Sequence, residues 1–118
     1  MLMHSEGVVK GRISLEQMVA AVSTNTAKMF GLTQKGEVAA GKDADLVIFD
    51  PKQKFTVSQS KLHMNVDYTP WEGWELTGMP SAVYSRGQKV AEWDGKQMQF
   101  VGKSGAGHFV KREPREGA

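Results

Sequence analysis

Histidine has the widest chemical range of the residue types in this 118-residue sequence, because it can ligate a metal or transfer a proton near neutral pH. The sequence contains three, His4, His63 and His108. None pairs with another histidine or a carboxylate at the close spacing of a metal-ligand motif. We therefore expect three ordinary surface or loop histidines and no metal ligand in this chain.

Two carboxylates, Asp43 and Asp45, stand two residues apart, and on a strand this spacing places both side chains on one face. Such a pair can perform acid–base chemistry or hold a metal ion. Here the two residues precede an apolar run, where Asp commonly forms a turn through its side chain. We expect the pair to be structural rather than catalytic.

The other chemical motifs are incomplete. Gly-Lys-Ser at 102–104 resembles the end of a phosphate-binding loop, but the glycine required five residues before Gly102 is Gln97. No serine lies in a Gly-x-Ser-x-Gly elbow, and the absence of cysteine excludes thiol chemistry and cysteine-bound zinc. The sequence thus predicts no catalytic and no cofactor-binding residue.

Three aromatic residues, Tyr68, Trp71 and Trp74, lie close together among prolines and glycines. They could stack on a ligand or a base. Because Trp and Tyr are enriched where one edge is apolar and the other is wet, buried loop anchors or subunit contacts are the better interpretation.

The first third of the chain predicts helices. Ser14 and Gln17 form a capping box, and apolar residues then recur at helical spacing through Val22. Asn25 can cap a second short helix that Gly31 ends. Two short helices meeting at 23–25 need a larger surface on which to pack.

From Lys35 onward the pattern is typical of strands. Residues 44–49 are largely apolar and β-branched up to Asp50-Pro51, which predicts a strand covered on both faces. Residues 55–57 are a second candidate strand, and 61–80 predict an ordered loop.

A meander of strands at 82–85, 88–93 and 97–101 should follow. The strands are separated by Arg86-Gly87 and Asp94-Gly95, and loops ending in glycine suit tight hairpins because glycine accepts positive φ. Overall we expect an α+β chain with three parts: residues 1–34, 35–101 and the tail 102–118.

Composition and charge narrow the class of protein. The longest apolar runs, 18–22 and 46–49, fall far short of the roughly 20 residues that span a bilayer, so no membrane association is expected. No secretion signal is recognisable at the start, which makes a cytoplasmic location the default. The net charge of +2 comes from the tail. A short mixed-charge tail is usually solvated or docked on a partner, and we expect no nucleic-acid binding.

Three longer stretches carry a family resemblance. The first two segments are Ser-Glu-Gly-Val-Val-Lys-Gly-Arg-Ile-Ser at 5–14 and Ser-Thr-Asn-Thr-Ala-Lys-Met-Phe-Gly-Leu at 23–32. Together they resemble the last helical segment of a dihydropyrimidinase or hydantoinase barrel. Lys-Gly-Glu-Val-Ala-Ala-Gly-Lys-Asp-Ala-Asp-Leu-Val-Ile-Phe-Asp at 35–50 is similar to a motif of many metal-dependent amidohydrolases.

A narrower motif is His-Met-Asn-Val-Asp-Tyr-Thr-Pro-Trp-Glu-Gly-Trp-Glu-Leu-Thr-Gly-Met-Pro at 63–80. With Ser-Arg-Gly at 85–87 and Gly-Ala-Gly-His-Phe at 105–109, it resembles the hydantoinase/dihydropyrimidinase branch.

The resemblance implies that the chain is the C-terminal portion of a parent enzyme built from a (β/α)₈ barrel and a small β-sandwich. The family opens cyclic amides, hydantoins and dihydropyrimidines, to N-carbamoyl amino acids, acting on non-peptide C–N bonds. It uses two metal ions, usually zinc, whose ligands precede the matched segment. The chain alone is then expected to be inactive and metal-free, and to self-associate or bind the missing barrel segment.

Two alternatives remain open. Some relatives of the family, the collapsin-response mediator proteins, are scaffold or interaction proteins that keep the fold without the chemistry. Arg86 and Asn65-Val66-Asp67 resemble the enzyme branch more closely. The other alternative is a free-standing enzyme with an unrecognised site, against which the missing ligand set argues.

Overall fold

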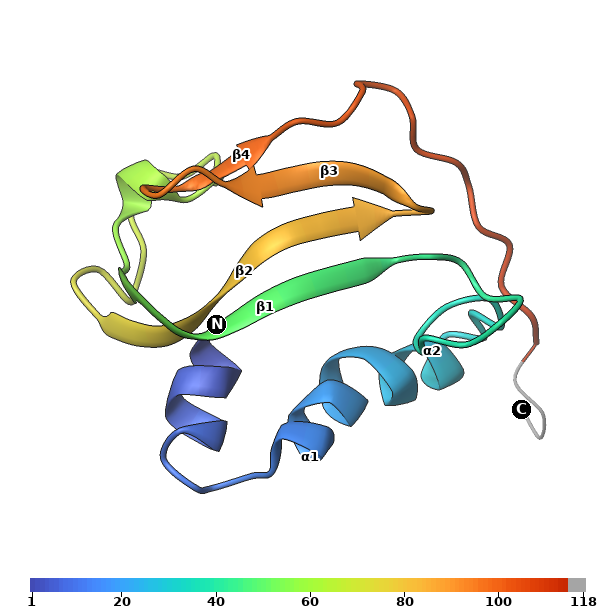
Figure 1. Cartoon of the computed structure of the whole chain (residues 1–118), viewed down its shortest axis with the longest axis horizontal. Coiled ribbons are helices and arrows are strands. Elements are labelled where there is room, and N and C mark those ends of the chain that lie inside the picture. The colour runs from blue at the N-terminus through green and yellow to red at the C-terminus, as the bar shows by residue number, and fades with distance from the viewer. Residues whose placement is uncertain (115–118) are drawn as a thin grey trace.

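The structure, a computed structural model, describes residues 1–114. The elements in chain order are η1 (Met3–Val8), α1 (Leu15–Val19), η2 (Ala20–Thr24), α2 (Asn25–Met29), β1 (Leu46–Thr56), η3 (Gln59–Lys61), β2 (Glu75–Ser85), β3 (Gln88–Trp93) and β4 (Met98–Phe100). The four strands of this region form one antiparallel sheet in the order β1-β2-β3-β4. The helices lie along one side of the sheet, which confirms the α+β class (Figure 1).

The predicted capping box begins the main helix. The Ser14 hydroxyl accepts a hydrogen bond from the Gln17 amide at 3.2 Å, and the Gln17 side chain accepts one from the Ser14 amide at 2.8 Å. The prediction of two separate helices is wrong, because Thr24 (φ −62°, ψ −48°) and Asn25 (φ −68°, ψ −38°) are themselves helical. Helix α1 therefore continues through the π-helical η2 into α2.

Strand β1 differs from the prediction in length and in cover. The strand does not end at Asp50-Pro51 but continues past a register shift between Asp50 and Lys54 to Thr56. The second strand predicted at 55–57 is therefore the end of β1 and not a separate strand. The Asp50 carboxylate accepts hydrogen bonds from two backbone amides inside this bulge. Val47 and Ile48 are more than half exposed, so residues 1–114 do not cover both faces of the strand.

Strand β2 begins earlier than predicted. The loop expected at 61–80 ends at Trp74, because residues from Glu75 onward pair with β1. Leu76 and Met79 lie in this segment and are 2 % exposed each, which makes them the most buried apolar residues of the described chain. The second part of the predicted loop thus contributes directly to the core.

The meander is confirmed. Arg86 (φ +47°) and Gly87 (φ +77°) both have positive φ, the conformation of a type I′ turn between right-twisted strands. The turn before β4 is organised by Asp94, whose carboxylate accepts hydrogen bonds from the amides of Lys96 and Gln97. This turn is longer than the predicted two residues, and β4 is correspondingly shorter.

A small hydrophobic core lies at one end of the sheet. It consists of Phe55, Val57, Leu76 and Met79, with Leu2, Leu62 and Trp93 packed around them. The rings of Phe55 and Trp93 meet edge to face, with centroids 5.9 Å apart. Within residues 1–114, no helix is both long and apolar enough to cross a membrane.

Candidate functional site

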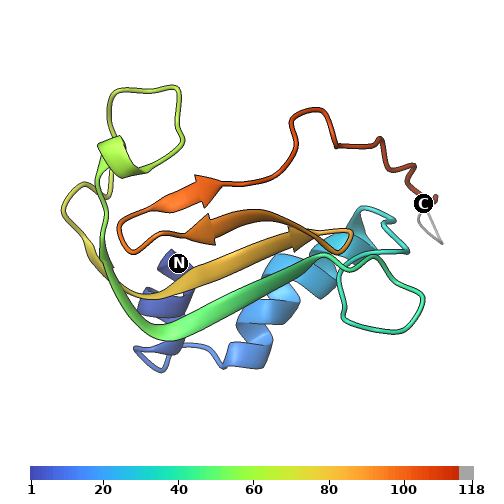
Figure 2. The same cartoon turned by 45° about the horizontal axis from the view of Figure 1, so that its top comes forward.

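The main concave feature of the described chain is an apolar groove between the helices and the sheet. Its volume is about 890 Å³, and apolar side chains from both layers line most of it. The helix side is formed by Leu15, Met18, Val19 and Val22, and the sheet side by Leu46, Phe49 and Leu76. We call this feature the docking groove. Figures 1 and 2 show the two layers that enclose it.

The helix side of the docking groove has no partner within the described chain. Leu15 is 49 % exposed, Val19 46 % and Val22 56 %, although all three lie on the apolar stripe predicted from the sequence. Folded proteins rarely leave contiguous apolar areas larger than a few hundred Å² without a binding role. The groove therefore has the chemistry of a packing surface.

One end of the docking groove is closed by helix η1. His4 is only 5 % exposed, and its Nδ1 lies 2.8 Å from the carbonyl oxygen of Thr77. The ring also meets Phe49 edge to face, with centroids 4.9 Å apart. The expectation of a surface or loop histidine is wrong for His4, because a helix that sequence periodicity did not predict docks it against β2.

The other two histidines are exposed. The Nε2 atom of His63 lies 2.9 Å from the carbonyl oxygen of Met98, which ties the 61–74 loop to β4. His108 lies in the tail. The three rings hydrogen-bond to different elements or face solvent, and the structure does not bring them together as a ligand set.

The predicted carboxylate pair lies beside a lysine. The Lys35 ammonium hydrogen-bonds to Asp43 at 2.8 Å and also to Asp45. A second oxygen of Asp45 accepts a hydrogen bond from the Arg86 amide at 2.8 Å. The pair thus joins the 33–45 loop to the β2–β3 turn.

The charges in this cluster shift each other's titration. Hydrogen bonds to Asp43 and then to Asp45 raise the pKa of Lys35 above its usual value. Partial burial alone would raise the pKa of Asp45, but the hydrogen bonds from Lys35 and the Arg86 amide outweigh it and lower that pKa. The Asp45 carboxylate is therefore held ionised beside the Lys35 cation, an arrangement that favours a structural role over proton exchange.

The aromatic residues of the 61–74 loop are not buried anchors in this chain. Tyr68 is 67 % exposed, Trp74 46 % and Trp71 39 %, while the buried residue of the loop is Thr69. Trp71 lines the docking groove. Their predicted role as subunit contacts stays a prediction.

The residues that the structure describes do not fit the two-metal centre implied by the family resemblance. No three of the histidine, aspartate and glutamate side chains in 1–114 gather into a group that could hold a metal ion. His4 uses Nδ1 on a backbone carbonyl, and Asp43 and Asp45 are paired with Lys35. We accordingly assign no chemical step to a metal bound by these residues.

Comparisons with known proteins agree with the motifs. The Amidohydrolase family profile matches residues 1–90. The D-hydantoinase of Geobacillus stearothermophilus is 52 % identical over 112 residues, which cover 94 % of this chain and 23 % of the relative. A D-phenylhydantoinase of Escherichia coli O1:K1 is 45 % identical over 114 residues, covering 96 % of this chain and 24 % of the relative.

Solved structures show the same relationship. The D-hydantoinase of Bacillus sp. AR9 is 50 % identical with a TM-score of 0.85, over 94 % of this chain and 24 % of that structure. The dihydropyrimidinase of Brevibacillus agri NCHU1002 has the same identity and TM-score, over 94 % of this chain and 23 % of that structure. The resemblance to the hydantoinase/dihydropyrimidinase branch is therefore confirmed for a chain that spans about a quarter of the length of these relatives. The chain belongs to the amidohydrolase family.

Proposed function

We propose that this chain is the C-terminal structural part of a hydantoinase- or dihydropyrimidinase-like enzyme. In this proposal α1, η2 and α2 are helices from the end of a (β/α)₈ barrel, and the sheet is part of a small β-sandwich. The complete enzyme opens hydantoins or dihydropyrimidines to N-carbamoyl amino acids with two metal ions, usually zinc. The metal ligands lie in the rest of that enzyme, and the proposed location is the cytoplasm.

The docking groove carries the proposal. Its helix side exposes Leu15, Val19 and Val22, and its sheet side is continuous with the core at Leu76. Burying such side chains stabilises a fold by about 1.5–3 kcal/mol each. A segment of the larger enzyme that filled the groove would therefore be held firmly, and the chain would in turn support it.

The coverage of the relatives supports this proposal. They match nearly all of this chain while the chain covers only about a quarter of them, and their names state hydantoinase activity for the whole proteins. On this proposal the isolated chain contributes packing and no chemistry. It is expected to show no ring opening of hydantoin or dihydrouracil, with or without added zinc, because no group of its described residues could hold a metal ion that lowers the pKa of a bound water.

The proposal is tested by transplanting the chain. The matched segment of the Geobacillus stearothermophilus D-hydantoinase is replaced by residues 1–118, and hydantoin ring opening is measured. We expect the chimera to be active and the isolated chain to be inactive. A Val19→Lys/Val22→Lys chimera should lose soluble active enzyme, whereas a Val66→Lys chimera, changed outside the docking groove, should retain it.

Two results would contradict the proposal. One is a soluble, metal-loaded chimera without activity. The other is zinc-dependent turnover by the isolated chain that disappears when one of its own residues is changed.

A further inference from the structure

The segment after β4 returns across the molecule to the helices. Residues 102–114, which we call the strap, leave the sheet beside β3 and run along one end of it to α2 (Figures 1 and 2). The strap is the described part of the tail that the sequence predicts at 102–118, and residues 115–118 of that tail lie outside the described part of the chain. Its course connects the two layers.

Three sets of hydrogen bonds to backbone groups hold the strap and the residue before it, Val101. The amides of Val101 and Gly102 donate to the carbonyl oxygen of Val90 at 3.0 and 3.3 Å. The guanidinium of Arg86 then donates to the carbonyl oxygen of Ala106 at 2.6 Å. At the far end the amide of Glu113 donates to the carbonyl oxygen of Gly31 at 2.9 Å. These contacts follow one another along β3, the β2–β3 turn and the helix end.

The anchor at Gly31 requires glycine for two independent reasons. Its φ of +65° is the left-handed conformation that commonly follows the end of a helix. A Cβ at this position would also lie 2.2 Å from the carbonyl oxygen of Glu113, a distance that neither backbone can tolerate. Gly31 thus ends the helix and at the same time admits the strap to the helix end.

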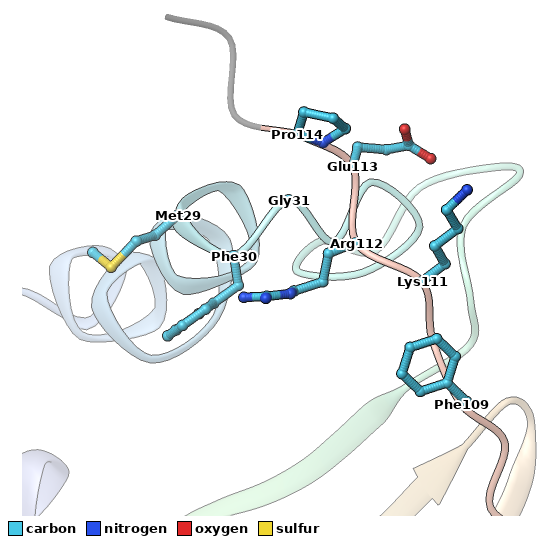
Figure 3. Close-up of a pocket in the computed structure, with 8 residues that line it drawn as sticks. All are labelled: Met29, Phe30, Gly31, Phe109, Lys111, Arg112, Glu113 and Pro114. Carbon is cyan, nitrogen blue, oxygen red and sulfur yellow. The ribbon is translucent and has the colours of Figure 1, made fainter. Parts of the chain in front are cut away.

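Side chains hold the strap loosely between its anchors. Phe109 is 93 % exposed, and a cavity of about 490 Å³ separates the strap from Met29 and Phe30. Figure 3 shows that the Arg112 side chain points toward Phe30, whereas Lys111 points away from the helix. A segment held by a few hydrogen bonds and little buried apolar surface opens at low free-energy cost.

The strap closes the end of the layered structure opposite η1. At one end His4 and Ser5 of η1 are fastened to Thr77 of β2. At the other end the strap reaches from Arg86 and Val90 on the sheet to Gly31 on the helix. Between these two ties lies the docking groove, which the described chain leaves open.

We propose that the strap is a latch: docked at Gly31 it fixes the end of α2 relative to the sheet, and released it frees that end of the helices to move. The latch is a conformational device of this chain and holds independently of the enzyme to which the chain is assigned above. The critical step is the close approach of the Glu113 carbonyl to Gly31.

Limited trypsin digestion of the full chain tests the latch, because Lys111 and Arg112 place two cleavage sites next to the Glu113 anchor. Gly31→Ala is compared with Gly41→Ala, which also has positive φ (+83°) but has no atom within 4 Å of the added Cβ. Mass spectrometry assigns each cut. We expect Gly31→Ala to raise the cleavage rate at Lys111 and Arg112 by about tenfold, since cleavage follows the population of the open form. Gly41→Ala should leave that rate unchanged.

A second pair of variants addresses the middle anchor. Arg86→Met removes the donor to Ala106 and should also accelerate strap cleavage, while Lys89→Met removes only the exposed pair with Glu92 and should not. Amide hydrogen exchange of β2 and β3 is followed in every variant. Equal cleavage in Gly31→Ala and Gly41→Ala would overturn the proposal. Faster cleavage accompanied by equal loss of protection in the sheet would overturn it as well, because it would report global unfolding.

Discussion

The imidazole of His4 donates a hydrogen bond from Nδ1 to the carbonyl oxygen of Thr77 at 2.8 Å, across 73 residues of sequence. A carbonyl oxygen only accepts, so the proton must be on Nδ1. The Thr77 amide in turn donates to the Ser5 hydroxyl at 3.1 Å. Thr77 thus uses both of its backbone polar groups on η1, which anchors the first helix to the sheet.

His4→Ala should lower the free energy of unfolding by about 2 kcal/mol or more, because it removes a buried hydrogen bond and the edge contact with Phe49. Urea denaturation measures the loss. His108→Ala, at an exposed position of the tail, is the control and should change little. Equal losses in the two variants would contradict the assigned role of His4.

Asp45→Asn should lower the melting temperature at neutral pH, with the difference from the parent chain vanishing in acid. The folded pKa of Asp45 is lowered, so its stabilisation is present above the unfolded value of about 3.9 and is lost as the pH falls through the folded pKa. Melting curves from pH 7 to pH 2.5 should therefore converge below about pH 4. Asp67→Asn, in the exposed loop, should run parallel to the parent chain, and a pH-independent effect of Asp45→Asn would refute the linkage.

Gly87→Val should destabilise the chain by more than about 1 kcal/mol, because a β-branched residue is strained at φ +77°. Gly107→Val is the matched control, since Gly107 has neither a positive φ nor an atom within 4 Å of an added Cβ. Thermal unfolding followed by circular dichroism compares the two. Similar melting temperatures for both variants would show that the β2–β3 turn tolerates another conformation.

The isolated chain should self-associate through the docking groove as its concentration rises. Val22 lies on the groove and is 56 % exposed, so Val22→Lys should shift the chain toward monomer by placing a charge on the apolar face. Light scattering across a concentration series measures the change. Val66→Lys, similarly exposed at 44 % but away from the groove, should leave association intact. A parent chain that stays monomeric at high micromolar concentration would contradict the prediction.

Local signals in the sequence predicted local structure correctly. The Ser14–Gln17 capping box and the Arg86-Gly87 turn depend on residues only a few positions apart, and both are present. The docking of His4 on Thr77 and the return of the strap to Gly31 produce no periodic pattern in the sequence. Each contact joins distant residues through backbone groups, which do not depend on residue type.

Proline misled the strand boundaries for a physical reason. Pro51 lies within a bulge of β1, which is an edge strand, and proline is tolerated in both settings. Pro80 pairs with β1 alone, since the pairing of β2 with β3 begins at Ala82. Each proline therefore lies where the strand has at most one neighbour for the missing amide to affect, so a residue that usually ends a strand does not end it here.

The sequential order of the sheet has a consequence for the time course of folding. Each strand pairs with its neighbour in sequence, and the β2–β3 and β3–β4 hairpins close over the short loops 86–87 and 94–97, at little cost in chain entropy. The β1–β2 pair closes over the longer segment 57–74. Helix η1, by contrast, is anchored by a hydrogen bond from His4 to Thr77, a residue that is synthesised 73 residues later. During synthesis the apolar helix face therefore emerges before the sheet residues that face it, and we expect the helices to dock after the β2–β3–β4 meander has formed.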